Sequence, residues 1–295
     1  MELPYFDAHC DTLSRCLRTG EDPIRTAGQT DLTRLSAYCP GGQIFAVFQD
    51  AAGLSREALE AAAARQAALF RRTRERYPAE MAHAFLSVEG GELLRCDPDR
   101  LELAAGWGVR CVNLTWNHAN ALSGSHREQP ERGLSDTGRA FVRRARRLGI
   151  LPDVSHLSDA GFWDLAKLEE GPILASHSNS RAVCPHSRNL TDSQFRAVRD
   201  SGGVVGINLY TAFIGGDGFL DSVLAHFDHF LNLDGERTVA LGSDWDGGIT
   251  AAGGIRGAED MGLLAEAMLR RGYGERLVRD IFWNNLARVL GEAEV

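Results

Sequence analysis

The amino-acid sequence predicts an α/β fold, a single (β/α)8 TIM-type barrel that forms one domain over residues 1–295. Three observations lead to this prediction. Short apolar runs rich in β-branched and aromatic residues recur along the chain, and helical patterns separate most of them. The length of 295 residues suits a barrel of roughly 250 residues with insertions. A doubly wound open sheet is the alternative fold.

Eight apolar runs have the character of buried strands: residues 5–11, 43–49, 83–89, 110–115, 150–155, 172–177, 203–209 and 238–243. Helices are expected at residues 56–77, 137–148, 159–169, 192–200, 219–233 and 260–271, and a last helix at 275–290 closes the chain. Strands that alternate with helices form parallel βαβ units. The long connections 12–42, 117–133 and 245–259 each follow a strand, so in a barrel they lie at the catalytic face.

Composition and charge limit the classes of partner. Hydrophobic residues make up 44% of the chain and the formal net charge is −8, which argues against binding to nucleic acid or to an anionic membrane. No apolar run approaches the roughly 18 residues of a membrane span, and no leader precedes the first expected strand, so we expect a cytoplasmic protein. The six cysteines are scattered without a C-x-x-C pair, which indicates free thiols.

Residue types that bind metals gather at the carboxyl ends of the expected strands. His9 and Asp11 end the first strand, where alternation directs both side chains to one face. Because the carboxyl ends of parallel strands meet at one rim of a barrel, such side chains are expected to converge. Histidines and carboxylates together are the ligands of zinc or a related divalent ion. The full set is His9, Asp11, Glu89, His156, His177 and Asp244.

Each of these residues alone has an ordinary structural explanation, such as a hydrogen-bonded histidine or a glutamate that caps a turn. The joint pattern is different, because a buried cluster of charges is costly unless it is paired or binds a metal. Other catalytic signatures are missing: the sequence has no H-E-x-x-H helix, phosphate loop or G-x-S-x-G elbow. A metal site at the barrel mouth is therefore the preferred interpretation.

Short motifs follow one another in a specific order: Asp7-Ala-His-Cys-Asp-Thr12, Gly41-Gly-Gln43, Ser87-Val-Glu-Gly-Gly91, Asp153-Val-Ser-His156, Ser176-His-Ser178, Ser187-Arg-Asn-Leu-Thr-Asp192, Gly242-Ser-Asp-Trp-Asp-Gly247 and Asn285-Leu-Ala-Arg-Val-Leu290. In this order and spacing they resemble the membrane (renal) dipeptidase family of zinc metallopeptidases. The resemblance runs from the first strand to the last helix and implies an amidohydrolase-like barrel. Without the secretion and anchoring segments of the animal enzymes, the chain is similar to a cytosolic bacterial-type member.

The resemblance also implies a binuclear zinc site with a role for each ligand. His9 and Asp11 would hold the first metal, and His156 and His177 would hold the second. Glu89 would bridge the two. Two zinc ions, or another divalent metal, are therefore the expected cofactors.

Beyond the metals, the resemblance implies that Asp244 shuttles a proton, that Arg188 faces the substrate carboxylate and that Tyr210 lies on the substrate side. One position departs from the family. Its best-known members have a histidine just after the fourth strand that polarises the scissile carbonyl, whereas this chain has Trp116 there. His118 follows two residues later, on the same face of a strand, and is the candidate replacement.

The sequence thus favours a zinc-dependent dipeptidase that cleaves dipeptides with free termini, with the C-terminal residue of either configuration. A hydroxide between the metals would attack the carbonyl while Asp244 shuttles its proton. The alternatives are another binuclear-metal amidohydrolase, acting on N-acyl amino acids, cyclic amides or lactones, and a non-catalytic metal-binding protein. Arg188 discriminates among them, because only a substrate with a terminal carboxylate requires it. The expected partner is a small dipeptide, with no nucleic acid or membrane, and a homo-oligomer stays open.

Overall fold

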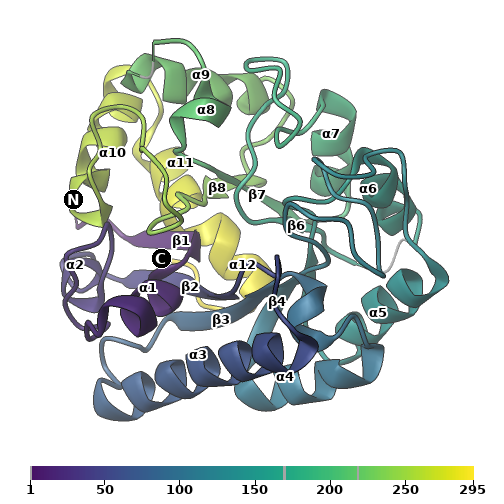
Figure 1. Ribbon diagram of the computed structural model, residues 1–295. Helices are drawn as coiled ribbons and strands as arrows, with labels where there is room; N and C mark the ends of the chain where they lie inside the picture. Colours follow the sequence, from purple (N-terminus) through teal and green to yellow (C-terminus); the bar gives the residue numbers. More distant parts are fainter. Residues whose placement is uncertain (1, 169–170, 218) are drawn as a thin grey trace.

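The computed structural model describes residues 2–168, 171–217 and 219–295 as a closed barrel of eight parallel strands (Figure 1). The strands are β1 (Tyr5–Cys10), β2 (Gly41–Phe48), β3 (Ala84–Glu89), β4 (Val109–Asn113), β5 (Leu151–Asp153), β6 (Leu174–Ala175), β7 (Val204–Ile207) and β8 (Val239–Leu241). Each strand pairs with the next in chain order, and β8 pairs with β1 to complete the ring. This topology confirms the predicted (β/α)8 fold and excludes the doubly wound sheet.

Helices surround the barrel. They are α1 (Thr12–Thr19), α2 (Leu32–Leu35), α3 (Arg56–Arg76), α4 (Leu101–Trp107), α5 (Asp136–Arg147), α6 (Asp159–Ala166), α7 (Asp192–Asp200), α8 (Thr211–Ile214), α9 (Leu220–Leu231), α10 (Met261–Arg270), α11 (Glu275–Arg279) and α12 (Asn285–Leu290). Short 3-10 turns span Gly91–Leu94, Pro98–Arg100 and Ala258–Asp260. A π-helical segment, Asp280–Asn284, joins α11 to α12, so the expected helix 275–290 is continuous.

The observed elements differ from the expected ones in two ways. The helices α1, α2, α4 and α8 lie in segments for which no helix is predicted, because elements this short offer too few positions for a period to emerge. The expected helix 159–169 is present as α6, although residue 169 lies outside the described residues. The expected strand 172–177 shrinks to β6, because side chains take the backbone N–H groups on both sides of it: Ile173 donates to the Ser201 hydroxyl and Ser176 to the Asp153 carboxylate, each at 3.1 Å.

Apolar side chains fill the barrel beneath its carboxyl rim. Phe6, Ile44 and Phe85 point inward from the first three strands and pack with Trp283 and Leu286 in one buried cluster. The Phe6 ring lies 5.8 Å from that of Phe85 and 4.9 Å from that of Trp283, measured between centroids. In Figure 1 the yellow α12 lies across the ring of strands. The C-terminal helical segment therefore closes the amino-terminal end of the barrel, leaving the opposite rim open for function.

Two expectations from composition can be compared with the structure. All six cysteines are free thiols, as the scattered spacing predicts. Within the described residues, none of the helices combines the length and apolarity needed to cross a bilayer.

Candidate active site

Six side chains of the types that bind metals converge at the carboxyl end of the barrel. His9 lies in β1 and Glu89 is the last residue of β3, while the other four lie in the loops that follow β1, β5, β6 and β8. Five of the six are buried, and Asp244 keeps 14% of its side chain exposed. The structure therefore brings together the whole set expected from the strand ends: His9, Asp11, Glu89, His156, His177 and Asp244.

A buried carboxylate beneath the rim fixes the ends of β1 and β8 relative to each other. Asp7 accepts hydrogen bonds from the backbone N–H of His9 at 3.0 Å and from the backbone N–H of Ser243 at 3.0 and 3.1 Å. The hydroxyl of Ser243 also donates to it. Burial raises the pKa of Asp7, and these hydrogen bonds oppose that rise. Because Ser243 precedes Asp244 in the chain, Asp7 positions both His9 and Asp244.

Glu89 occupies the centre of the cluster, and its two oxygens face different histidines. Its Oε2 lies 3.5 Å from His9 Nε2. Its Oε1 lies 3.0 Å from His156 Nε2 and 3.6 Å from His177 Nε2. His9 Nε2 also lies 3.7 Å from Asp11 Oδ2. Because its two oxygens face histidines on opposite sides, Glu89 suits a carboxylate shared between two cations. Two compact ligand groups also occur here, and they share His9: one is His9, Glu89 and His177, and the other is His9, Asp11 and Asp244.

The imidazoles of His156 and His177 direct their Nε2 atoms at each other, 2.9 Å apart. Nδ1 of His156 donates to Oδ1 of Asn117 at 2.9 Å, and Nδ1 of His177 lies 2.7 Å from the hydroxyl of Ser176. When both Nδ1 atoms donate outward, both Nε2 lone pairs point to the same place. Such an arrangement is repulsive without a cation between the lone pairs, so it fits a metal site.

His9 gives a second, independent indication of a metal. Both of its ring nitrogens are buried without a hydrogen-bond partner among the described residues, and so is Oδ1 of Asp11. Buried polar atoms are nearly always hydrogen-bonded, and a cation held by Nε2 of His9 and by Asp11 would satisfy two of these three atoms. Nitrogen and oxygen donors of this kind fit a zinc-type divalent ion.

Burial and neighbouring charges shift the protonation of the cluster. Burial raises the pKa of Glu89 to about 7, against the opposing influence of His9. Burial alone would lower the pKa of His9, but Glu89 and Asp11 together raise it well above its ordinary value. Burial, and then the charge of Arg188, lowers the pKa of His156, and burial likewise lowers that of His177. His156 and His177 are thus neutral, the form that binds metals.

Two of the cluster residues have left-handed backbone conformations, with φ of 71° at His156 and 67° at Asp244. For a residue other than glycine this conformation costs about 1–3 kcal/mol and persists where the surroundings enforce it. A Cβ added at Gly247 would lie 2.7 Å from Oδ1 of Asp244, so a larger residue there would displace this carboxylate. Strain of this kind is common at functional sites, where it sets the direction of a side chain.

One oxygen of Asp244 is held by the protein, and the other faces the cluster. Asn208, just after β7, donates from Nδ2 to Oδ2 of Asp244 at 3.0 Å. Asn208 is itself fixed, because its Oδ1 accepts from the backbone N–H of Tyr210 at 2.7 Å and its own backbone N–H donates to Asn179. Oδ1 of Asp244 lies 3.8 Å from His9 Nε2. Asp244 is therefore placed to exchange a proton at the edge of the cluster.

Arg188 is a buried cation without a carboxylate partner among the described residues. Its Nη2 donates to the backbone oxygen of His177 at 3.1 Å and its Nη1 donates to the hydroxyl of Ser178 at 3.5 Å, while Nε has no partner. The guanidinium carbon lies 5.4 Å from the centre of the Phe213 ring, which also packs against the ring of Tyr210. Burial lowers the pKa of Arg188 to about 10, so it stays charged at neutral pH. It is suited to an anionic group of a ligand.

The structure does not bring His118 into this cluster. Its side chain is 45% exposed, with Nδ1 3.4 Å from Glu128 and Nε2 3.6 Å from Asp50. The ring of Trp116 instead packs near His156, at 6.2 Å between centroids, and lies 5.8 Å from the ring of His118. At the positions compared with the family, it is therefore Trp116 and not His118 that packs beside the cluster.

Sequence analysis missed three polar residues around the cluster: Asn117, His126 and Asn208. Asn117 bonds to His156, and His126 Nε2 bonds to Asn117 at 2.9 Å. Both belong to the long connection 117–133, where the fold of the loop alone decides which side chains meet. Asn208 does carry a signal in the sequence, because it is a polar residue at the carboxyl end of an apolar strand.

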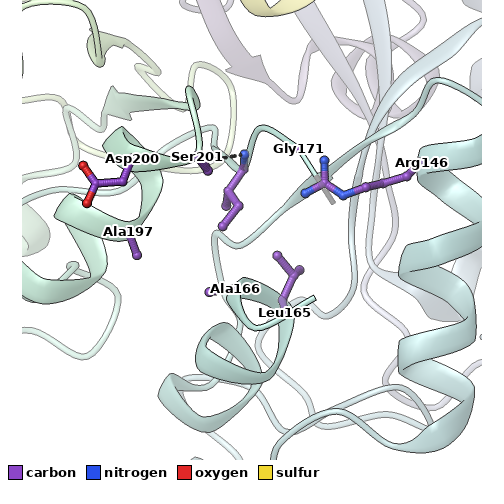
Figure 2. A pocket seen from close by; sticks show the side chains of 8 residues that line it. Arg146, Leu165, Ala166, Gly171, Ala197, Asp200 and Ser201 are labelled. Carbon is purple, nitrogen blue, oxygen red and sulfur yellow. Dashed lines mark hydrogen bonds between the residues drawn. The ribbon is translucent and has the colours of Figure 1, made fainter. Parts of the chain in front are cut away.

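A separate cavity of about 440 Å³ lies away from this rim. Figure 2 shows its lining, which comes from the carboxyl ends of α5, α6 and α7 and the segment before β6. The hydroxyl of Ser201 accepts a hydrogen bond from the backbone N–H of Ile173 there. The described lining holds one carboxylate, Asp200, and no histidine. Since helices of a barrel end on its amino-terminal face, this cavity is not the candidate active site.

Comparison with known proteins agrees with the geometry of the rim. The chain matches the model of the membrane dipeptidase family, peptidase family M19, over residues 1–295. It is 29% identical to a metallopeptidase from Rhodobacter sphaeroides solved with a phosphinate mimic of the dipeptide L-Ala-D-Ala; the TM-score is 0.88, over 99% of each chain. It is 30% identical to dipeptidase AC, a metallopeptidase of family M19, with a TM-score of 0.86 over 100% of this chain and 99% of that one.

Two bacterial relatives are similar in sequence without a known activity. An uncharacterized protein in the pqqA 5′ region of Klebsiella pneumoniae is 39% identical over 195 residues, 62% of this chain and 72% of that protein. An uncharacterized protein in the PQQ-III 3′ region of Acinetobacter calcoaceticus is 29% identical over 283 residues, 78% of this chain and 90% of that protein. From the match over residues 1–295, the chain belongs to the membrane dipeptidase family, peptidase family M19, and is a metallopeptidase.

Proposed function

We propose that this metallopeptidase is a zinc dipeptidase that hydrolyses dipeptides with free amino and carboxyl termini. The observation that carries the proposal is Arg188, a buried guanidinium bonded to the backbone of the metal-site residue His177. A cation this close to a hydrolytic centre matches a substrate whose carboxylate lies one residue from the scissile bond. The mimic of L-Ala-D-Ala bound by the Rhodobacter sphaeroides relative supports the same substrate class, including a D-residue at the C-terminal position.

The ligand set supports two zinc ions. His9 and Asp11 would hold one ion, His156 and His177 would hold the other, and Glu89 would contact both. Zinc ions bound by these residues supply an activated water as nucleophile and polarise the scissile carbonyl.

Asp244 would move the proton. Its free oxygen, Oδ1, faces the cluster, while Asn208 holds Oδ2 and so keeps the carboxylate from turning. As an ionised group it would accept the proton of the attacking water, and once protonated it would donate that proton to the leaving amine.

Arg188 gives the site a fixed positive charge, which suits a short substrate with a free carboxylate. The planar fork of Arg188 would bind both oxygens of the C-terminal carboxylate, beside Phe213 and Tyr210. A substrate extended beyond that carboxylate would place an uncharged amide against Arg188, which favours dipeptides.

His118 stays our candidate for a donor to the scissile carbonyl, with one condition. Its imidazole lies within 3.4–3.6 Å of Glu128 and Asp50, so it would have to turn away from both carboxylates to reach the substrate. If it does not turn, His118 has no part in polarising the carbonyl.

The decisive experiment compares zinc-loaded protein on L-Ala-L-Ala, L-Ala-D-Ala, the C-terminal amide of each, and N-acetyl-L-alanine. We expect hydrolysis of the free dipeptides and a kcat/KM at least about 100-fold lower for the amides, since Arg188 would lose a charge-assisted, bidentate partner. Arg188→Lys should reduce kcat/KM for the dipeptides but not for the amides. Arg270→Lys, at an exposed arginine at the carboxyl end of α10, is the matched control. Faster hydrolysis of N-acetyl-L-alanine would instead favour the broader amidohydrolase activity.

A further inference from the structure

The loop between β4 and α5 contributes a hydrogen-bonded chain that ends on a proposed metal ligand. Oδ1 of Asn117 lies 2.9 Å from Nδ1 of His156 and 2.9 Å from Nε2 of His126. An amide oxygen has two lone pairs and no hydrogen to donate, so it accepts from both rings. One atom thus determines the tautomer of two histidines.

For His156 this tautomer leaves the lone pair on Nε2. That atom faces Oε1 of Glu89 at 3.0 Å and Nε2 of His177 at 2.9 Å. A metal-binding histidine needs its donor nitrogen unprotonated and its ring held in direction, and a hydrogen bond to the other nitrogen supplies both. Asn117 performs this task here.

For His126 the same bond leaves the lone pair on Nδ1, which accepts a hydrogen bond from the hydroxyl of Ser187 at 2.9 Å. Ser187 directly precedes Arg188, the residue proposed to bind the substrate carboxylate. The backbone N–H of His126 also donates to the backbone oxygen of His156 at 2.9 Å. His126 therefore connects the loop that carries Arg188 to the backbone and, through Asn117, to the side chain of His156.

The occupancy of both ring nitrogens distinguishes the role of His126 from that of a catalytic residue. With Nε2 bonded to Asn117 and Nδ1 bonded to Ser187, no N–H of the ring is left to polarise a substrate. The ring of His126 lies beside that of His156, 5.9 Å away between centroids, so His126 supports this proposed zinc ligand from the side.

We propose that His126 and Asn117 are positioning residues that set the tautomer and direction of His156, and that Ser187 ties this chain to the carboxylate-binding loop. The inference rests on the proposed function only in taking His156 as a zinc ligand. It follows that the loss of either residue should weaken the binding of one of the two zinc ions and leave the other ion bound.

The test measures zinc affinity by competition with a fluorescent chelator, on the full-length protein. Asn117→Ala and His126→Ala should each reduce the affinity for one zinc ion by about 10–100-fold, which is the usual effect of losing a hydrogen-bond partner of a metal ligand. Asn117→Asp keeps an acceptor for both rings, and His126→Gln keeps a donor toward Asn117, so both should retain most of that affinity. His229→Gln, at a histidine of α9 paired with Asp192, is the matched control.

A spectroscopic readout separates positioning from simple loss of structure. In zinc-loaded wild-type protein, long-range 1H–15N correlation should show His126 as the neutral Nε2–H tautomer. A protonated His126 or the Nδ1–H tautomer would overturn the proposal. Unchanged zinc affinity in both alanine variants would also overturn it. The same holds if both zinc ions bind equally more weakly and Asn117→Asp does not restore their affinity. A wild-type protein that binds no zinc would instead remove the proposed function itself, so the two failures are distinguishable.

Discussion

At the scale of single residues, the chemistry of the site depends on which atom of each side chain the protein occupies. Asn208 holds Oδ2 of Asp244 and leaves Oδ1 toward the cluster. Asn117 holds Nδ1 of His156 and leaves Nε2 toward Glu89. In both cases an uncharged amide orients a titratable group without neutralising it. The arrangement allows the carboxylate to exchange a proton and the imidazole to bind a metal.

Asp244→Asn tests the proton shuttle. The amide cannot accept a proton, so kcat should fall by about 10²–10⁴-fold, the usual contribution of a general base. Zinc content, measured by atomic emission, should stay near that of the wild type, because the five proposed zinc ligands are intact. Asp221→Asn, at an exposed carboxylate of α9, is the control and should leave kcat unchanged. A near-normal kcat in Asp244→Asn would contradict the proposed role.

His118→Ala tests the carbonyl donor. If the imidazole turns into the site, its removal should lower kcat by about 100-fold or more with little change in KM, as for other donors to a developing oxyanion. Rates on L-Ala-L-Ala at saturating zinc measure this. Glu128→Gln is the informative companion, because it weakens the contact that holds His118 away and should not lower kcat. An unchanged kcat in His118→Ala would assign carbonyl polarisation to the metals alone.

At the scale of elements, the two ends of a barrel strand have different roles. Side chains nearer its amino end pack in the core, and those at its carboxyl end face the candidate site. The start of β1 packs Phe6 against Trp283 and Phe85, whereas its end carries His9. This division explains why the sequence was sufficient to predict that these side chains converge: once the barrel closes, residues at the carboxyl ends of its strands all lie at one rim. No such rule determines where the side chains of the loops point. His118 fits the strand pattern two residues after Trp116, yet the chain has already left β4, and alternation no longer determines its direction.

Leu286→Ala tests how much the C-terminal segment contributes by closing the barrel. Leu286 is fully buried in the interior cluster, so its truncation should leave a cavity and reduce the free energy of unfolding by about 2–5 kcal/mol. Urea denaturation of the zinc-loaded protein measures the loss. Leu263→Ala, at a leucine of α10 that is 45% exposed, is the control and should stay within about 0.5 kcal/mol of the wild type. Equal losses in the two variants would contradict a closing role for the segment.

At the scale of the whole molecule, the fold was more predictable than the details of the site. Eight apolar runs in alternation with helices already implied a closed ring, and β8 pairs with β1 as that reading requires. What the sequence could not provide are contacts between distant loops. Asn117 reaches His156, and His126 reaches Ser187, only after three separate connections have folded over the rim. Such contacts have no period and no local signature, so they require a structure.

The last prediction concerns the whole protein, because zinc binding and protonation compete for the same cluster. Burial raises the pKa of Glu89 to about 7, so below that pH its carboxyl holds a proton that zinc must displace. The pKa of His9 is also raised, which adds a second proton to be released, whereas the lowered pKa values of His156 and His177 leave those rings ready to bind. At fixed free zinc, the apparent affinity should therefore fall by at least roughly tenfold for each pH unit below 7.

Zinc at about 100 times its Kd stabilises the native state by about 2.7 kcal/mol per site, so this stabilisation should be larger at pH 8 than at pH 6. Thermal unfolding at pH 6, 7 and 8, in zinc buffer and in chelator, measures it, and a larger zinc effect at pH 6 would contradict the assignment of Glu89 and His9 as ligands.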